Sequence, residues 1–342
     1  MGGLYKSMDF SYLIKEAKYY NRLNGLKRAF KKFILTQTPF KKIVNTPVYN
    51  RFYARAIVKK SRVIEPKVLQ IENTNLCNAK CVMCPHTIMK RKGKIMTLND
   101  FKKILENVDY KIKRLTITGF GEPFMDSGLI DKINFVNEKY PWIKIDIYTN
   151  ASLLTPEITD KLVKTKLDRI TFSINGTRAN YGKIMGLDYE KTKANVLYFL
   201  SKNKKTLTNI SLMILKENEK EIKEFMDFWR EKADSVRVYM PSNWAGSLSI
   251  PVISKTGMKQ KRWPCSGLWM AITVDVNGNM IMCCRDYESK VSFGNLLKEK
   301  ARKIRQGQKF QELLKKHLDY NYSSEICKSC DNSFDSSLDW IC

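Results

Sequence analysis

The sequence contains no long apolar run. Its longest uncharged stretch, residues 238–254, is interrupted by Pro, Gly, Asn and Ser, which makes it a poor candidate for a transmembrane helix. The first residues, MGGLYKSMDFSYLIKE, lack the apolar core that a secretory signal peptide requires. The chain has no low-complexity segment, and no internal repeat beyond an alternation of strand-like and helical patterns. These absences predict a globular protein of the cytoplasm.

Acidic residues are scarce relative to basic ones. The 342 residues include 61 Lys and Arg but only 34 Asp and Glu, which gives a formal net charge of +27. A field of this strength favours an anionic partner, although a lysine-rich proteome would produce the same excess. Nucleic acid is the least favoured of the anionic partners, because the sequence has no recognisable RNA-binding motif.

Much of this charge lies in residues 1–66, which hold fifteen Lys and Arg and three acidic residues. Apolar residues recur there at helical spacing, at 10, 13, 14 and 17 and again at 26, 30, 33 and 34. The pattern predicts a basic, amphipathic helical N-terminal extension. Such an extension either packs its apolar stripe on the rest of the protein or contacts an anionic membrane peripherally.

From residue 68 onward, strand-like and helical patterns alternate. The expected strands are residues 68–73, 114–118, 143–148, 169–174, 210–215 and 236–239. The expected helices are residues 98–107, 130–139, 156–164, 189–202 and 219–232, with Thr97 and Thr155 as N-caps. This alternation predicts parallel βαβ units and therefore an α/β fold. Periodicity leaves open whether the parallel sheet closes into a barrel.

The alternation ends after Trp244. Residues 269–276 and 280–284 flank Asn277-Gly278-Asn279, a turn signal that predicts a β-hairpin. A basic helix is expected over residues 296–318, and it leads to a Cys-x-x-Cys pair. The C-terminal part is therefore expected to be a small module of one hairpin and one helix.

Nine cysteines are present, and they are clustered in a way that differs from a small secreted disulfide scaffold. The first group is Cys77, Cys81 and Cys84, which follow the first expected strand. Three thiolates this close together can bind one face of a [4Fe–4S] cluster and leave its fourth iron without a protein ligand. The spacing alone also allows a zinc site in which His86 is the fourth ligand.

The Cys-x-x-x-Cys-x-x-Cys spacing after a first strand resembles the signature of the radical S-adenosylmethionine (SAM) superfamily. The resemblance implies a partial (β/α)6 barrel, a [4Fe–4S] cluster on these cysteines, and SAM bound at the open iron. It further implies reductive cleavage of SAM to a 5′-deoxyadenosyl radical, which abstracts a hydrogen atom from the substrate. A reductant of the flavodoxin or ferredoxin type is implied as a partner.

Other positions match this superfamily in their order along the chain. Gly121, Glu122 and Pro123 follow the second expected strand and correspond to its GGEP motif, in which the acidic side chain receives the SAM ammonium group. Met83 stands where relatives often carry an aromatic residue near the adenine, and Phe120 stands where they often carry Gly. The other expected cofactor contacts are Thr149, Asn150 and Ser173. Each match alone is ordinary strand-end chemistry, whereas their joint order favours a SAM site over zinc.

A second group of cysteines lies in the C-terminal part. The expected ligands of one auxiliary [4Fe–4S] cluster are Cys265, Cys283, Cys327 and Cys330. Four cysteines that include a Cys-x-x-Cys pair also suit a structural zinc site. The region resembles the shorter, twitch form of the SPASM extensions of some radical SAM enzymes. The expected domains are the extension over residues 1–66, a radical SAM barrel over 67–246 and the auxiliary module over 247–342.

Cys284 and Cys342 remain outside these groups. Cys283 and Cys284 are neighbours on an expected strand and should face opposite ways, so only Cys283 is expected to bind the cluster. Cys284 is then either a buried thiol or the hydrogen-atom donor that radical epimerases of this superfamily use. Cys342 is either a stray thiol or a further ligand.

The expected function is abstraction of a hydrogen atom from a polar, sugar-like or anionic small molecule, ending in epimerisation or oxidation. Oxidation requires an acceptor for a second electron, a role that suits the auxiliary cluster, whereas epimerisation requires a thiol such as Cys284. Two alternatives stay open, namely a peptide-modifying enzyme and a non-catalytic iron–sulfur electron carrier or scaffold. Residues 1–66 do not resemble a leader-binding domain, which weakens the peptide alternative.

Overall fold

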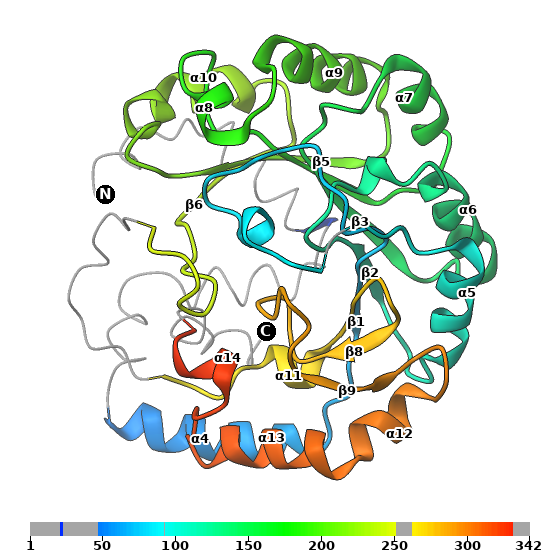
Figure 1. Cartoon of the computed structure of the whole chain (residues 1–342), viewed down its shortest axis with the longest axis vertical. Coiled ribbons are helices and arrows are strands. Elements are labelled where there is room, and N and C mark those ends of the chain that lie inside the picture. The colour runs from blue at the N-terminus through cyan, green and yellow to red at the C-terminus, as the bar shows by residue number, and fades with distance from the viewer. Residues whose placement is uncertain (1–20, 23–46, 92, 251–261, 331–342) are drawn as a thin grey trace.

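The computed structural model describes residues 21–22, 47–91, 93–250 and 262–330. At its centre, six parallel strands lie side by side in sequence order (Figure 1). They are β1 (Val68–Ile71), β2 (Arg114–Ile117), β3 (Lys144–Thr149), β4 (Arg169–Ser173), β5 (Leu207–Met213) and β6 (Ser235–Tyr239). The expected α/β fold and its six strands are confirmed, with bounds that differ by one to three residues.

Helices connect these strands and cover the outer face of the sheet (Figure 1). They are α5 (Leu98–Asn107), α6 (Leu129–Lys139), α7 (Pro156–Leu162), α8 (Tyr181–Met185), α9 (Tyr189–Lys202) and α10 (Ile222–Arg230). Both predicted N-caps are confirmed, because the Thr97 hydroxyl accepts a hydrogen bond from Asp100 N and the Thr155 hydroxyl accepts one from Ile158 N. The short helix α8 was not predicted.

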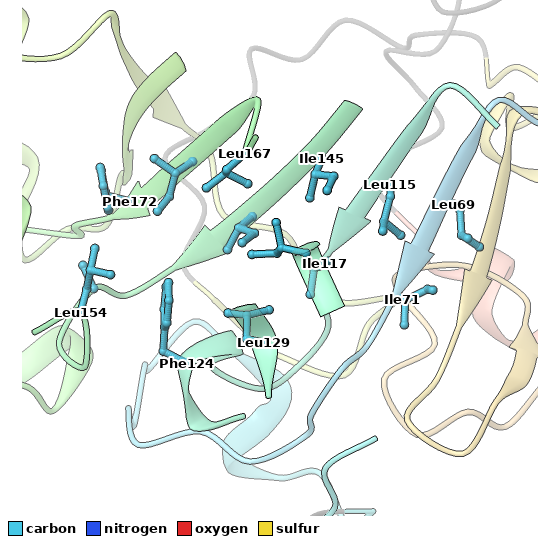
Figure 2. Close-up of a cluster of buried hydrophobic side chains, with 14 of the residues drawn as sticks. Leu69, Ile71, Leu115, Ile117, Phe124, Leu129, Ile145, Leu154, Leu167 and Phe172 are labelled. Carbon is cyan, nitrogen blue, oxygen red and sulfur yellow. The ribbon is translucent and has the colours of Figure 1, made fainter. Parts of the chain in front are cut away.

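The hydrophobic core lies between the sheet and these helices (Figure 2). Leu69 and Ile71 of β1 belong to it, as do Leu115 and Ile117 of β2, and all four are fully buried. Because successive strand residues face opposite ways, the intervening positions point to the inside of the barrel. Many of these inward positions are polar, as Thr116 is on β2. Function is therefore expected inside the barrel and at the carboxyl ends of its strands.

A charged trio links three neighbouring strands at the inner face. Asp146 of β3 is fully buried, and its Oδ2 lies 2.7 Å from Arg114 Nη1 of β2. The same oxygen lies 2.6 Å from Arg169 Nη2 of β4. Removing one member of such a buried pair leaves the remaining charge uncompensated, which is strongly destabilising.

The C-terminal hairpin continues the same sheet. Strand β7 (Ala271–Val274) pairs in parallel with β1, and β8 (Asn279–Ile281) and β9 (Ser292–Asn295) follow as antiparallel strands. The predicted turn is confirmed, with Gly278 at a φ of +80° that favours glycine. In the described part of the chain β6 and β9 are the two edges of the sheet, so the barrel is open.

The prediction of one helix over residues 296–318 is wrong. Two helices, α12 (Ala301–Gln306) and α13 (Gln308–Leu318), occupy this part of the chain. Gly307 separates them, because its extended backbone, with ψ at 145°, ends the first helix and precedes the second. Before α12, the Asn295 side chain accepts a hydrogen bond from Leu297 N and forms a turn where helix was expected.

Most of the predicted N-terminal extension, including both amphipathic patterns, lies outside the described residues. Helix α4 (Pro47–Ser61) is described, and its Ile57 is buried in one cluster with Trp269 of the C-terminal module. The module also contains the short helices α11 (Gly267–Met270) and α14 (Glu325–Lys328). No helix in the described ranges is long and apolar enough to cross a membrane.

The substitution Asp146→Ala tests the charged trio. We expect it to lower the free energy of unfolding by about 3 kcal/mol, because Arg114 and Arg169 lose their buried partner. The matched control is Asp227→Ala, which removes the exposed pair that Lys223 and Asp227 form on α10 and should cost less than about 0.5 kcal/mol. Urea denaturation followed by circular dichroism measures both. Equal losses in the two variants would contradict the role assigned to Asp146.

Candidate functional site

The loop after β1 carries the side chains of Cys77, Cys81 and Cys84, all of them partly buried. Asn75 holds the start of this loop, since its Oδ1 accepts a hydrogen bond from Lys94 N at 2.7 Å. The turn within the loop is closed by Cys84 N, which donates to Cys81 O at 3.1 Å. The three thiols therefore lie on one short segment that the carboxyl end of the sheet supports.

Helix α8 holds the middle of the cysteine loop. Lys80 N donates to Met185 O at 2.8 Å, and Val82 N donates to Ile184 O at 3.0 Å. Between them, Cys81 Sγ lies 3.4 Å from Met185 Sδ. Sequence analysis missed this contact, because the segment that contributes it follows β4, about one hundred residues later in the chain.

Burial raises the pKa of two of these thiols. It raises the pKa of Cys77 to about 11, with Glu122 and Cys84 adding to the shift, and it raises the pKa of Cys81 further. Iron takes the place of such protons when a cluster binds. Three thiols within eight residues of one loop supply the number and kind of donors that three irons of a [4Fe–4S] cluster need, so the residues present fit that group.

His86 was the fourth ligand in the zinc alternative for this loop. Its Nε2 lies 3.1 Å from Asn75 O, so the ring is in hydrogen-bond contact with the backbone of the loop. One ring nitrogen therefore already has a structural partner.

The turn after β2 lies directly against the cysteine loop. Glu122 N donates to Leu76 O at 2.8 Å. A Cβ at position 121 would lie 2.3 Å from Thr74 O, so only glycine allows this close approach of the two backbones. Pro123 then begins the short 3₁₀ helix η2 (Pro123–Met125). The structure thus places the turn of Gly121, Glu122 and Pro123 against the start of the cysteine loop.

The Glu122 carboxylate is buried at the carboxyl ends of β2 and β3. Thr149 Oγ1 donates to its Oε1 at 2.5 Å, and Asn150 N donates to its Oε2 at 2.7 Å. Burial nevertheless raises the pKa of Glu122 to about 7. No basic side chain of the described residues forms an ion pair with it. A buried carboxylate of this kind suits a cationic ligand group, such as the ammonium of SAM.

Three of the other expected SAM contacts lie at neighbouring strand ends, and Met83 lies in the cysteine loop. Thr149 and Asn150 bind Glu122, and the Asn150 side chain also donates to Asn78 Oδ1 of the cysteine loop at 3.0 Å. Ser173 ends β4 and lies partly buried beside Ser211 of β5. Met83 belongs to the main core cluster and is 4% exposed. Thr149 and Asn150 therefore position Glu122 and the loop in this structure.

The second group of cysteines lines one cavity of about 230 Å³. Its cysteine lining residues are Cys265, Cys283, Cys284, Cys327 and Cys330. They come from the segment before β7, the segment after β8 and the α14 region, and β7 joins them to β1 of the barrel. Burial raises the pKa of Cys265 to about 11 and that of Cys327 to about 12, so here too iron would replace protons. The donor set fits a fully ligated cluster.

The expectation that Cys283 and Cys284 lie on a strand and therefore face opposite ways is wrong. Strand β8 ends at Ile281, so neither cysteine lies on a strand and the alternation of strand side chains does not apply to them. A turn closed by Asp286, which accepts hydrogen bonds from Lys290 N and Val291 N, replaces the end of the expected strand. Cys283 is partly buried and Cys284 is exposed, and both line the cavity. Cys342 lies outside the described residues.

Two residues of this region were missed by sequence analysis. His317 of α13 lies with its Nε2 3.3 Å from Cys327 Sγ, and burial, reinforced by Arg262, lowers its pKa to about 4. Trp244 donates from its Nε1 to Met83 O at 2.8 Å, and the guanidinium of Arg285 lies 4.7 Å from its ring centroid. The rarity of histidine, of which the chain has two, was the signal that could have identified His317.

Comparison with known families agrees with these features. Residues 71–228 match the family described as "Radical SAM superfamily". Residues 265–331 match the SPASM family, described as "Iron-sulfur cluster-binding domain". The first match runs from the last residue of β1 into α10 and includes the cysteine loop and the Glu122 turn, and the second includes all the cysteines that line the cavity.

Two curated relatives are informative. An S-adenosyl-L-methionine-dependent 2-deoxy-scyllo-inosamine dehydrogenase from Niallia circulans is 24% identical over 277 residues, which cover 78% of this chain and 92% of the relative. A tungsten-containing aldehyde ferredoxin oxidoreductase cofactor-modifying protein from Pyrococcus furiosus is 29% identical over 168 residues, which cover 46% of each. The chain thus spans about half the length of this second relative.

Solved structures share the fold. BtrN in complex with AdoMet and 2-DOIA matches with a TM-score of 0.53 and 19% identity, over 78% of this chain and 93% of BtrN. Streptococcus suis SuiB bound to S-adenosylmethionine matches with a TM-score of 0.63 and 18% identity, over 98% of this chain and 88% of SuiB. At these identities the likeness shows the architecture alone.

The fold and both cysteine sites define the class as a SAM-dependent iron–sulfur enzyme built on an open parallel barrel. The chain belongs to the radical SAM superfamily and carries a C-terminal SPASM iron–sulfur domain. A [4Fe–4S] cluster and SAM are therefore its cofactors, and the SPASM domain adds auxiliary iron–sulfur binding. The zinc alternatives for the two cysteine groups are set aside.

The pH dependence of stability tests the state of Glu122. The folded protein binds this proton more tightly than the unfolded chain, because burial raises the pKa from 4.5 to about 7. The resulting stabilisation is complete below about pH 4.5 and is lost as the pH rises through about 7. Since Glu122→Gln stays neutral, its stability relative to wild type should increase over this window by on the order of 1–3 kcal/mol.

Thermal unfolding of SAM-free protein at about pH 5 and about pH 8 measures this difference. The matched control is Glu190→Gln, at an exposed carboxylate whose difference from wild type should stay nearly constant. If the difference in stability between wild type and Glu122→Gln were the same at both pH values, the elevated pKa of Glu122 would be contradicted.

Proposed function

We propose that this enzyme abstracts a hydrogen atom from a polar, sugar-like or anionic small molecule and completes a two-electron oxidation. The observation that carries the proposal is the position of the buried Glu122 carboxylate beside Cys77, Cys81 and Cys84. Together they supply the donor set for a cluster and the carboxylate for a SAM ammonium group. A non-catalytic electron carrier would have no use for the second of these features.

In this proposal Cys77, Cys81 and Cys84 hold the first cluster, and the open iron is left for SAM. When bound, the cluster and SAM supply a one-electron cleavage that yields a 5′-deoxyadenosyl radical. Glu122 orients the SAM ammonium group, while Thr149 and the backbone of Asn150 hold both oxygens of its carboxylate in place. Met83, Gly121, Pro123 and Ser173 complete the expected SAM environment.

Cys265, Cys283, Cys327 and Cys330 are the proposed ligands of one auxiliary cluster. Their cavity lies on the same sheet as the first site, because β7 pairs with β1. This placement suits an acceptor for the second electron that oxidation removes. The name of the Niallia circulans relative, a dehydrogenase, also supports oxidation.

Epimerisation is the second candidate, and the exposed Cys284 favours it. Its thiol lines the cavity without being needed as a fourth ligand, so it is available to return a hydrogen atom. A peptide substrate has less support, since the likeness to SuiB extends only to the fold. A flavodoxin- or ferredoxin-type reductant and a cytoplasmic location accompany either reaction. Contact of residues 1–66 with an anionic membrane is a further proposal.

Reductive cleavage of SAM is the first test. The protein is reconstituted anaerobically with iron and sulfide, treated with dithionite and SAM, and analysed for 5′-deoxyadenosine by liquid chromatography. Wild type and Cys284→Ala should both form it, whereas Cys77→Ala should fall to background because the cluster loses one of its three ligands. Formation at the background level in wild type would remove the enzymatic proposal and leave an iron–sulfur carrier.

Turnover in deuterium oxide separates oxidation from epimerisation. The first probe is 2-deoxy-scyllo-inosamine, followed by a panel of aminocyclitols and phosphorylated sugars, with mass spectrometry of the product. We expect a product two hydrogens lighter in both wild type and Cys284→Ala, because oxidation returns no hydrogen to the reacting carbon. Epimerisation through Cys284 would instead give a product with the formula of the substrate except for one hydrogen replaced by deuterium. This product would form in wild type and not in Cys284→Ala.

A further inference from the structure

His317 occupies a defined place in the auxiliary cavity. It lies in the last turn of α13, is 1% exposed and lines the cavity together with the cysteines. The Tyr322 ring packs against it edge-on, with ring centroids 5.2 Å apart. This packing and the burial hold the imidazole in one orientation.

The two ring nitrogens of His317 have different partners. Cys265 N lies 3.3 Å from Nδ1, and because a backbone N–H can only donate, Nδ1 must be the acceptor. A neutral imidazole with an unprotonated Nδ1 carries its proton on Nε2. Nε2 lies 3.3 Å from Cys327 Sγ, so its N–H points to that sulfur. The contacts thus determine the tautomer as well as the orientation of the ring.

Hydrogen bonds to a ligand sulfur affect the redox properties of a cluster. The reduced cluster carries one more negative charge than the oxidised cluster, so an N–H donor stabilises the reduced state more and raises the reduction potential. Arg262 adds a fixed positive charge nearby, since its guanidinium donates to the Cys327 carbonyl and stacks on Tyr322 at 4.2 Å. Both features favour an auxiliary cluster that accepts an electron.

We propose that His317 is a positioning residue that donates a hydrogen bond to the cluster ligand Cys327 and raises the reduction potential of the auxiliary cluster. The inference rests on the proposed function, in which Cys327 binds that cluster. In the oxidation, the substrate radical gives one electron to the auxiliary cluster, which is reduced. The hydroxyl group of the substrate radical releases its proton to solvent. The C–O single bond of the substrate becomes C=O, the proton goes to solvent and the electron goes to the cluster.

The test uses the full chain with Cys77→Ala, Cys81→Ala and Cys84→Ala, which leaves only the auxiliary cluster. Its midpoint potential is measured by redox titration followed by electron paramagnetic resonance in this parent, in His317→Leu and in His317→Gln. Leucine removes the donor, whereas glutamine presents an amide N–H at similar reach. We expect the leucine variant to bind an electron about tenfold more weakly, a shift of about 59 mV to lower potential. Glutamine should recover most of this loss.

The other histidine supplies a matched control, because His86 contacts Asn75 O on the cysteine loop. His86→Leu should leave the auxiliary potential unchanged. An unchanged potential in His317→Leu with full iron content would overturn the inference. If that variant lost its iron, the glutamine variant and the parent labelled with ¹⁵N-histidine would decide. Weak nitrogen coupling in the labelled parent indicates a hydrogen bond, whereas strong coupling would make His317 a ligand and overturn the proposal.

Failure of the proposed function gives a different result. Cys327→Ala in the same background should lose auxiliary-cluster iron, because it removes a ligand. Full iron content in that variant would reject the assignment of Cys327, whatever the His317 variants show. A shifted potential in His317→Leu together with iron loss in Cys327→Ala supports both the assignment and the hydrogen bond.

Discussion

The buried carboxylate of Glu72 joins the three segments from which the site is built. It directly follows β1 and is 3% exposed. Phe120 N, in the turn after β2, donates to its Oε1, and Val276 N, in the C-terminal hairpin, donates to its Oε2, each at 3.1 Å. Arg91, beyond the cysteine loop, pairs with it at 2.5 Å. Because an unpaired buried carboxylate is costly, these partners must stay in place, and the loop, the turn and the hairpin with them.

Strand β1 supplies the frame around this carboxylate. It pairs in parallel with β2 on one side and with β7 on the other, so the cysteine loop and the auxiliary cavity are built on neighbouring strands of one sheet. Trp244 adds a second link, because it donates to Met83 O and stacks with Arg285, the neighbour of Cys284. This connection suits the proposed oxidation, in which the substrate radical gives an electron to the auxiliary cluster.

Much of the barrel could be predicted from the sequence, because its signals are local. Thr97 and Thr155 are N-caps through contacts with residues three positions later, and strand periodicity reflects burial of alternate side chains. The prediction of one helix over residues 296–318 was also wrong for a local reason. The helical spacing of apolar residues continues across Gly307, whereas the backbone of Gly307 is extended and interrupts the helix. The strand expected to reach Cys284 ended at Ile281, because a turn forms there in which Asp286 N donates to Cys283 O and the Asp286 carboxylate accepts from Val291 N.

The sequence by itself determined the family, the cysteine spacing and the Gly121-Glu122-Pro123 turn, because a metal-binding loop and a strand-end turn are short segments with their own residue requirements. Only the tertiary structure decided that Glu122 is buried without a basic partner among the described residues, that α8 holds Cys81, and that His317 faces Cys327. It also decided that the hairpin extends the barrel sheet through β7. These features depend on contacts between distant segments, and burial, charge and hydrogen-bond direction at such contacts have no signature in a local pattern.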